Sequence, residues 1–323
     1  MTLSIEASAA RRAPSRRGEA VAVSVVIPTR NRGDLIAETL AALGCVDDPG
    51  MEILVVDQST NDATRRCVAQ VAHDDDRVRA IPTTSIGSSA ARNIGAQRAR
   101  GEVIAYTDDD CIVTTGWLTA IVAEFADPTV SAVFGRLVPY ESGARNGREV
   151  GFKESEARQE FTGKLPPWHI GHGGNMAFRR SALLEAGGFD PLLGAGGYFG
   201  ACEDPDLAYR LLASGRKIVY SPKAEAYHKH WKDWRAQRRM ERSYGIGAGA
   251  MFAKYLRCGD RYGARLAATW MWQLGVRRIG SGLLKWRSLK TMYLGYCQLV
   301  YPWLGAARSL RRRVDPAILT YVG

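Results

Sequence analysis

Apolar runs rich in β-branched residues alternate with amphipathic segments between residues 21 and 106, and this alternation constrains the fold more than any other feature. The pattern predicts buried strands at 21–28, 52–56, 78–81 and 102–106, and helices at 34–43, 62–72 and 88–100. Strands and helices that alternate in this way are typical of an α/β protein with a doubly wound, mostly parallel sheet. In such sheets ligands bind beyond the carboxyl ends of the strands.

Three polar clusters follow directly after predicted strands. They are TRNR at 29–32, DQSTND at 57–62 and DDD at 108–110. Because the carboxyl ends of parallel strands meet at one edge of a sheet, we expect the clusters to lie side by side there and to form a ligand site. Farther along the chain the alternation loosens, and the sequence predicts a polar excursion at 141–167 and helices at 179–186 and 206–214.

The third cluster places three consecutive aspartates, Asp108 to Asp110, at the end of the apolar run VIAYT. Repelling carboxylates are unfavourable there unless a cation neutralises them, and Mg²⁺ or Mn²⁺ takes oxygen ligands of this kind. We therefore expect Asp108, Asp110 or both to hold such an ion beside phosphate oxygens. The alternative is an acid-rich helix N-terminus, which is disfavoured because Tyr106 and Thr107 end a strand.

Two further positions suit a nucleotide. Asp57 ends its strand in the same plane, where a carboxylate can accept hydrogen bonds from a base or a ribose hydroxyl. The alternative is an ordinary turn residue, because its neighbours are good turn formers. Arg92 and Asn93 lie on an early turn of a predicted helix, beside small residues, and could face a pyrophosphate or a base. An exposed helix arginine is the alternative there.

Glu203 and Asp204 follow the Gly-rich stretch GAGGYFGAC and open a predicted helix. A carboxylate there could take a proton from an acceptor hydroxyl, or the two acids could form a normal first turn beside Pro205. His228 and His230 alternate along an extended segment. One imidazole could complete a metal shell begun by the aspartates, or both could be ordinary surface histidines.

Several motifs occur together in one order along the chain. They are SVVIPTRNR (24–32), EILVVDQSTNDAT (52–64), ARNIGA (91–96), the Asp-x-Asp of 108–110, GGNMAFRR (173–180) and Glu-Asp at 203–204. In this ordered set the chain resembles a family 2 glycosyltransferase with the GT-A fold, from about Val23 to His228. Many members carry a second Asp in the second motif, where this chain has Gln58, and Asp57 is left as the expected nucleotide contact.

The resemblance implies single displacement with inversion, from a UDP-, GDP- or dTDP-sugar to a hydroxyl of a polysaccharide or lipid-linked saccharide of the cell envelope. It implies Asp204 as the general base, with Glu203 beside it. It implies Mg²⁺ or Mn²⁺ on the donor diphosphate, held by Asp108, Asp110 and His228. The implied nucleotide-sugar contacts are Pro28, Thr29, Arg30, Asp57, Arg92, Asn93, Asp108, Asp109 and Asn175.

Two other functions stay open from the residues. A sugar-1-phosphate nucleotidyltransferase also places a metal beside a similar sheet, but such enzymes carry a Gly-rich phosphate loop after the first strand. This chain has PTRNR there, without glycine until Gly33. The other alternative is a catalytically inactive, membrane-binding scaffold of the same fold, which the intact acidic positions disfavour.

The basic character of the chain is confined to its tail. Residues 229–323 contain 19 Lys or Arg and 4 Asp or Glu, a net charge of +15 against +11 for the whole chain, which leaves −4 for the rest. The tail also holds most of the tryptophans: Trp231, Trp234, Trp270, Trp272, Trp286 and Trp303. Cations mixed with aromatic rings suit an anionic membrane surface, and a solvated helical face is the alternative. We expect no nucleic acid as a partner.

These features predict three parts: a disordered lead-in at 1–20, a GT-A domain at 21–230 and a helical extension at 231–323. The lead-in lacks the apolar core of a signal peptide. The uncharged stretch 292–307 is too short to span a bilayer and contains Pro302, so we expect it to be interfacial or packed. Scattered cysteines without a CxxC pair indicate a reducing compartment, and the expected location is cytoplasmic, at the inner face of the plasma membrane.

Overall fold

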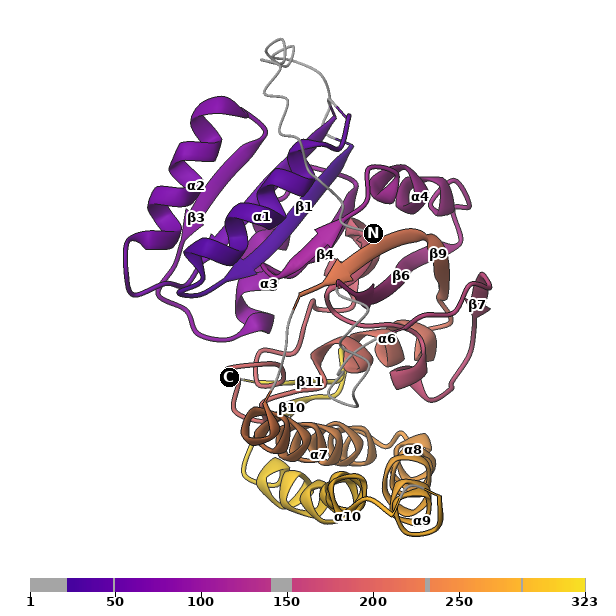
Figure 1. The fold of residues 1–323 in the computed structure, drawn as a ribbon. Coiled ribbons are helices and arrows are strands. Elements are labelled where there is room, and N and C mark those ends of the chain that lie inside the picture. The colour runs from indigo at the N-terminus through magenta and orange to yellow at the C-terminus, as the bar shows by residue number, and fades with distance from the viewer. Residues whose placement is uncertain (1–21, 49, 141–152, 230–232, 286, 323) are drawn as a thin grey trace.

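The computed structural model describes residues 22–48, 50–140, 153–229, 233–285 and 287–322 (Figure 1). Several sequence-based expectations concern residues outside those ranges, namely the lead-in 1–20, part of the polar excursion, His230, Trp231 and Trp286.

The first half of the sheet is parallel, as the alternation predicts. Its elements are β1 (Val23–Thr29), α1 (Gly33–Gly44), β2 (Met51–Asp57), α2 (Ala63–Asp74), β3 (Val78–Pro82), α3 (Ser88–Arg98) and β4 (Val103–Thr107). β1 pairs in parallel with β2 and β4, and β2 pairs in parallel with β3. The seven predicted elements of this half are therefore confirmed within a few residues.

The second half makes the sheet mixed. Its strands are β5 (Cys111–Val113), β6 (Val130–Pro139), β7 (Gln159–Phe161), β8 (Asn175–Arg179) and β9 (Lys217–His228). The strand order is β3-β2-β1-β4-β8-β6-β9-β5, with β7 paired to β9. β8 runs antiparallel to both β4 and β6, whereas β6 and β9 are parallel. Helix α5 (Arg180–Glu185) and helix α6 (Glu203–Ala213) confirm the two helices expected in this half, and the short helices α4 (Trp117–Glu124) and η2 (Pro167–His169) complete it.

Helices cover both faces of the sheet. Side chains of β1 alternate: Val25 and Ile27 join the core under α1 and α4, and Val26 joins the core under α3 and α6. This period of two is the one expected of a strand buried on both sides. The two cores fix the strand ends relative to the helices that follow them, and the candidate site is built from those ends.

The tail is helical, as predicted, up to a short hairpin. It consists of α7 (Trp234–Arg257), α8 (Tyr262–Trp270), the π-helical turn η3 (Met271–Val276), α9 (Arg277–Leu284), α10 (Leu289–Ser309), β10 (Val314–Asp315) and β11 (Thr320–Tyr321). Figure 1 shows α7 and α10 side by side beneath the sheet, with α8 and α9 at one end.

A buried ionic network joins the tail to the sheet domain. Lys254 Nζ of α7 lies 2.7 Å from Asp190 Oδ2 and 2.6 Å from Asp206 Oδ1 of α6, and all three side chains are fully buried. Arg210 Nε donates to Asp206 Oδ2 at 2.8 Å. Burial tends to raise the pKa of Asp206, but Lys254 and Arg210 outweigh it and hold that pKa below its usual value. The tail is thus packed on the sheet domain through charged groups that water does not reach.

Candidate active site

The three polar clusters meet at one edge of the sheet, as predicted. Thr29 at the end of β1 is in register with Asp57 at the end of β2. Thr29 Oγ1 also donates to Asp109 Oδ2 at 2.7 Å, which ties the first cluster to the third. The parallel register of β1, β2 and β4 brings these residues together, because the carboxyl ends of all three strands lie at one edge of the sheet.

Arg32 neutralises two of the three clustered aspartates. Its Nη1 lies 2.8 Å from Asp109 Oδ1 and 3.0 Å from Asp110 Oδ2. Burial raises the pKa of Asp109 to about 6 against the opposing charge of Arg32. Arg32 therefore supplies part of the positive charge that the sequence analysis assigned to a metal ion. Sequence reasoning missed Arg32, because nothing in TRNR distinguishes it from Arg30, which is exposed.

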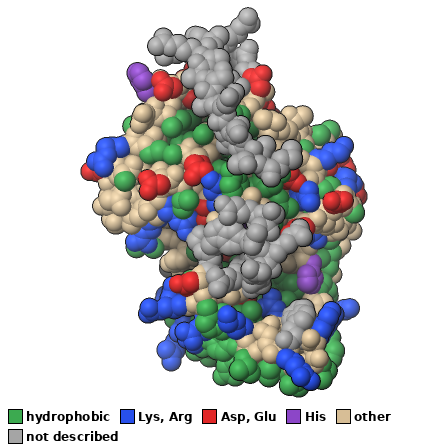
Figure 2. All heavy atoms as spheres, viewed as in Figure 1, with side chains coloured by type: hydrophobic (Ala, Val, Ile, Leu, Met, Phe, Trp, Pro, Cys, Tyr) green, Lys and Arg blue, Asp and Glu red, His purple; other side chains and the backbone are tan. Residues whose placement is uncertain are grey.

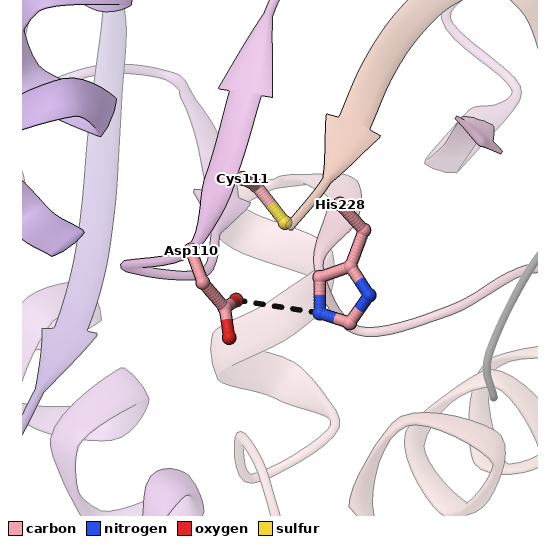
Figure 3. A group of neighbouring side chains, drawn as sticks. All are labelled: Asp110, Cys111 and His228. Atoms are coloured by element: carbon pink, nitrogen blue, oxygen red, sulfur yellow. Dashed lines mark ion pairs between the residues drawn. The ribbon is translucent and has the colours of Figure 1, made fainter. Parts of the chain in front are cut away.

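Asp110 and His228 form a pair that can hold a cation. Strand β5 pairs with β9 so that Cys111 lies opposite His228, and His228 Nε2 is 3.3 Å from Asp110 Oδ1. Figure 3 shows the carboxylate and the imidazole turned toward each other at the strand ends, with the Cys111 sulfur beside them. One ligand atom from each of the three residues lies within 4.8 Å of the others.

These ligands fit a divalent ion that accepts oxygen and nitrogen. Burial raises the pKa of the Cys111 thiol well above its usual value, and the charges of Asp108 and Asp110 add to the rise. Asp108 faces two ways: its Oδ1 pairs with Arg92, and its Oδ2 lies beside Gly174. A Cβ on Gly174 would sit 3.1 Å from Asp108 Oδ2 and 3.2 Å from Cys111 Sγ. Asp108, which the sequence also suggests as a metal ligand, is not in the group of ligand atoms within 4.8 Å of one another, which Asp110, Cys111 and His228 form.

Arg92 connects the aspartate cluster to the start of α6. Its Nη2 lies 3.0 Å from Asp108 Oδ1, and its Nη1 lies 2.7 Å from Glu203 Oε1. Ser88 Oγ donates to the same Glu203 oxygen at 3.0 Å. Burial alone would lower the pKa of Arg92, but the surrounding carboxylates outweigh it and raise that pKa. Arg92 is a buried ion-pair residue here, which rules out the exposed helix arginine.

Asp204 has a carboxyl group whose pKa is shifted toward neutrality. Its pKa is raised to about 7, first by burial and then by the charge of Glu203, while Arg92 and a hydrogen bond with the backbone of Gly173 oppose the rise. A base is most effective when its pKa lies near the working pH. Glu203, by contrast, is held in ion pairing with Arg92.

Tyr244 on α7 lies beside these acids, and sequence reasoning missed it. Burial raises its pKa well above the usual value, and the charges of Asp204 and Glu203 add to that rise. The Cys202 thiol, just before the acids, approaches the Tyr244 carbonyl oxygen at 3.6 Å. Because Tyr244 lies 40 positions after Asp204 on a tail helix, no local pattern links it to the site.

Two residues predicted to contact the nucleotide sugar, Asn175 and Asn93, instead make hydrogen bonds within the protein. Asn175 is fully buried: its Oδ1 accepts from Trp117 Nε1 at 2.9 Å, and its Nδ2 donates to the carbonyl oxygens of Arg136 and Ala224, both at 2.8 Å. Asn93 exchanges two 2.8 Å hydrogen bonds with the backbone of Phe189. Polar side chains committed in this way hold segments together, and we leave both residues out of the proposed donor contacts below.

A model of the family described as glycosyl transferase family 2 matches residues 24–187, about half of the chain. The chain belongs to glycosyl transferase family 2. The match ends before Glu203, so the family model covers the strand-end aspartates and leaves the start of α6 outside.

Curated relatives agree with this membership. A pre-mycofactocin glycosyltransferase of Mycobacterium tuberculosis is 28% identical over 245 residues, covering 72% of this chain and 48% of that protein. A GalNAc(5)-diNAcBac-PP-undecaprenol β-1,3-glucosyltransferase of Campylobacter jejuni is 28% identical over 144 residues, covering 44% and 42%. The chain thus spans about half the length of the curated relatives it matches.

Solved structures show the same fold. A mannosyltransferase of Pyrobaculum calidifontis, in complex with GDP-Man and Mn²⁺, superposes with a TM-score of 0.60 at 20% identity, covering 89% of this chain and 86% of that one. The protein therefore has a GT-A-like α/β fold with a mostly parallel, mixed sheet followed by C-terminal helices, as the sequence predicts.

Proposed function

We propose that this protein transfers a sugar from a nucleotide-sugar donor to a hydroxyl of an acceptor, by a metal-assisted single displacement that inverts the anomeric carbon. The observation that carries the proposal is the arrangement around Arg92. This one side chain bridges Asp108, in the aspartate cluster that follows β4 and suits a donor diphosphate, and Glu203, beside Asp204 at the start of α6, where the acids suit an acceptor. In a single displacement, the leaving diphosphate and the attacking hydroxyl lie on opposite sides of the reacting carbon. Arg92 connects the acids assigned to the diphosphate with the acids assigned to the hydroxyl.

The donor nucleoside is proposed to lie over the ends of β1 and β2. Thr29 and Asp57 are in register there, with the half-buried Pro28 before them and the exposed Arg30 after them. The Asp57 carboxylate accepts one hydrogen bond from the Ser59 backbone N–H at 2.8 Å, which fixes its orientation at the strand end. A fixed carboxylate at this edge suits a ribose hydroxyl or a base N–H.

Asp110 and His228 are proposed to hold Mn²⁺ or Mg²⁺, with Oδ2 of Asp108 as the next ligand. The P. calidifontis neighbour was solved in complex with GDP-Man and Mn²⁺, which supports a divalent ion in a protein of this fold. When bound, such an ion stabilises negative charge on the leaving diphosphate. Asp109 stays bound to Thr29 and Arg32, and we assign it to shaping the loop that carries the ligands.

Asp204 is proposed to take the proton. The acceptor oxygen attacks the anomeric carbon as its proton passes to the Asp204 carboxylate, and the bond from that carbon to the diphosphate breaks with the electron pair leaving on the diphosphate. A pKa of about 7 lets Asp204 start this step deprotonated in a large share of molecules at neutral pH. Glu203 contributes by holding Arg92 and by raising the pKa of its neighbour.

The acceptor is proposed to be a saccharide carried on a lipid, with the enzyme at the cytoplasmic face of the membrane. The C. jejuni relative is named for an undecaprenol-linked acceptor, which supports this class. The basic, aromatic tail also supports a protein that acts at a lipid surface.

The test is incubation with UDP-glucose, UDP-GlcNAc or GDP-mannose and Mn²⁺, with detection of released nucleoside diphosphate. A glycosyltransferase releases nucleoside diphosphate from at least one donor, by transfer or by slow hydrolysis, and Asp204→Asn loses that release. A nucleotidyltransferase would release nucleoside diphosphate from none, and would instead make nucleotide sugar from sugar 1-phosphate. No turnover with any donor, in the presence of lipid-linked acceptors, would contradict the proposal.

A further inference from the structure

The outward face of α10 is apolar. Its exposed side chains recur with helical spacing along one side, at Leu289, Tyr296, Val300, Trp303 and Leu304. Leu289 is 81% exposed and Trp303 is 68% exposed. Figure 2 shows hydrophobic side chains along the lower edge of the molecule, over the C-terminal helices, with Lys and Arg side chains on either side.

The inward face of α10 carries several small residues, among them Gly295, Gly305 and Ser309. A Cβ on Gly305 would overlap the carbonyl oxygen of Ile246, and a Cβ on Gly249 of α7 would overlap that of Pro302. The two helices therefore approach each other closely, backbone against backbone. This reverses the pattern of a surface helix in a water-soluble protein, in which large apolar residues face inward. Small residues between helices and large apolar residues outside are typical of helices that contact lipid.

The apolar surface continues around the turn between α9 and α10. Leu283 and Leu284 at the end of α9 are exposed, Leu284 to 83%, and η3 adds the exposed Trp272 and Val276. We name this set, together with the exposed side chains of α10, the outer apolar face. Isolated exposed apolar residues are ordinary, but a set of this size on adjoining helices indicates a binding surface.

The segment that carries the outer apolar face has charged residues of one sign. Residues 261–314 contain 11 Lys or Arg and no Asp or Glu. Among them, Arg277, Lys285, Lys290, Arg311 and Arg313 are exposed near the two ends of the face. Anionic phospholipid headgroups complement such a rim. Two copies of this chain would bring like charges together, which disfavours a homodimer through this face.

We propose that the outer apolar face of η3, α9 and α10 lies on an anionic lipid bilayer, with its leucines and tryptophans at headgroup depth and its basic rim on the lipid phosphates. The helices within the described ranges include no candidate for a membrane span. The face belongs to the tail and none of its residues is assigned to the active site.

This placement would also bring a lipid-linked acceptor to the base. Tyr244 lies beside Asp204, and the next residue, Gly245, packs against Tyr301 and the carbonyl of Cys297 on α10. One helix layer, about 10 Å, therefore separates α10 from the acids of α6. This step rests on the proposed function, whereas lipid binding does not.

The experiment is flotation of the full chain with vesicles of phosphatidylcholine alone and of phosphatidylcholine mixed with phosphatidylglycerol. The wild type should float with the mixed vesicles and far less with phosphatidylcholine. The variant Leu284→Ser/Leu289→Ser/Trp303→Ser should bind at least about tenfold more weakly, because three apolar side chains no longer enter the lipid. The variant Lys285→Gln/Lys290→Gln/Arg311→Gln should lose the preference for phosphatidylglycerol.

A control removes exposed apolar side chains outside the outer apolar face. Val122→Ser/Leu184→Ser changes exposed residues of α4 and α5 and should float like the wild type. If the triple serine variant does not fold, as judged by circular dichroism, Leu284→Ser alone tests the same face at a helix end. Donor hydrolysis measured without vesicles should be unchanged in all these variants, which separates failure of lipid binding from failure of the proposed function.

Three results would overturn the proposal. One is equal flotation of the wild type and the serine variants. Another is equal binding to both vesicle types, which would remove the role of the basic rim. The third is a wild-type dimer in sedimentation velocity that the serine substitutions dissociate, without vesicle binding, because the face would then belong to a second copy of the chain.

Discussion

Arg92 and Glu203 are 111 positions apart in the chain, and their side chains form a buried ion pair of 2.7 Å between Nη1 and Oε1. Because Arg92 also binds Asp108, one guanidinium fixes the acids at the end of β4 relative to the acids at the start of α6. Its planar guanidinium points separate N–H groups at the two carboxylates in fixed directions, which the point charge of an ammonium group does not do.

Replacement of Arg92 should therefore damage both stability and turnover. Arg92→Leu leaves buried acids without their cation, and we expect it to lower the free energy of unfolding by about 3–5 kcal/mol. Arg92→Lys keeps the charge but not the planar guanidinium, and we expect more than about tenfold loss of kcat/KM with smaller destabilisation. Chemical denaturation and initial rates measure the two effects. Arg98→Leu, on the exposed side of the same helix, is the control and should change neither.

The sequence predicts those parts of the fold that depend on local hydrophobic periodicity. The strands and helices between Val23 and Thr107 follow from hydrophobic periodicity, and their parallel order brings the polar clusters to one edge. The antiparallel place of β8 beside β4 does not follow, because that pairing joins residues about 70 positions apart and depends on how the two cores close.

The same limit applies within the site. Asp110 and Asp204 stand out in sequence because strand ends and helix starts are local features. The partners of these acids are not local: Arg32 reaches the aspartates from another strand end, and Tyr244 comes from the tail. Asn175 differs, because its motif suggests a contact with the ligand. The structure instead buries it and gives it three hydrogen bonds to other parts of the protein.

The rate of transfer should depend on the ionisation of Asp204. Its carboxylate must be deprotonated to act as a base, so kcat/KM should rise with pH and level off above the pKa of about 7. Asp204→Asn should lose at least about a hundredfold in kcat while keeping the affinity for donor. A pH–rate profile and single-turnover measurements test this. An unchanged rate in Asp204→Asn would remove the residue from the base role.

The same raised pKa should make the folded protein less stable as pH rises. Between the unfolded value of about 4 and the folded value of about 7, the folded state binds more protons at Asp204, so the free energy of unfolding falls with increasing pH. Asp204→Asn removes that loss, and we expect it to be more stable than the wild type at pH 8 by on the order of 2 kcal/mol. Denaturation at pH 4 and pH 8 checks the sign, since the difference should nearly vanish at pH 4.

Removal of a proposed metal ligand should weaken metal-dependent nucleotide binding. Asp110→Asn takes away a charged oxygen ligand and should raise the Kd for UDP or GDP in the presence of Mn²⁺ by on the order of a hundredfold, and His228→Gln by about tenfold or more. Calorimetric titration with and without Mn²⁺ measures both. His73→Gln, on the exposed side of α2, serves as the matched histidine control. Equal affinity in Asp110→Asn and the wild type would place the ion elsewhere.

Asn175 should matter for folding and not for donor recognition. Asn175→Ala leaves Trp117 Nε1 and two buried carbonyl oxygens without their partner, which should cost about 2–4 kcal/mol of stability. Below its melting temperature the variant should keep the wild-type KM for the donor. A raised KM without loss of stability would instead support the contact that the motif suggests.

Lys254 should decide whether the tail stays attached to the sheet domain. Lys254→Met leaves Asp190 and Asp206 buried without their shared cation and should lower the free energy of unfolding by about 3–5 kcal/mol. Lys164→Met removes an ion pair of similar length, 2.8 Å to Asp260, but Lys164 is exposed, and we expect a loss below about 1 kcal/mol. Denaturant titrations of the two variants compare a fully buried network with a pair whose lysine is exposed, at nearly equal distances. If the two variants lose equal stability, the buried network does not hold the tail, and residues 231–323 would be a separable extension. A larger loss in Lys254→Met means that Lys254 and Asp206 fix the helices of the outer apolar face to the acids of α6.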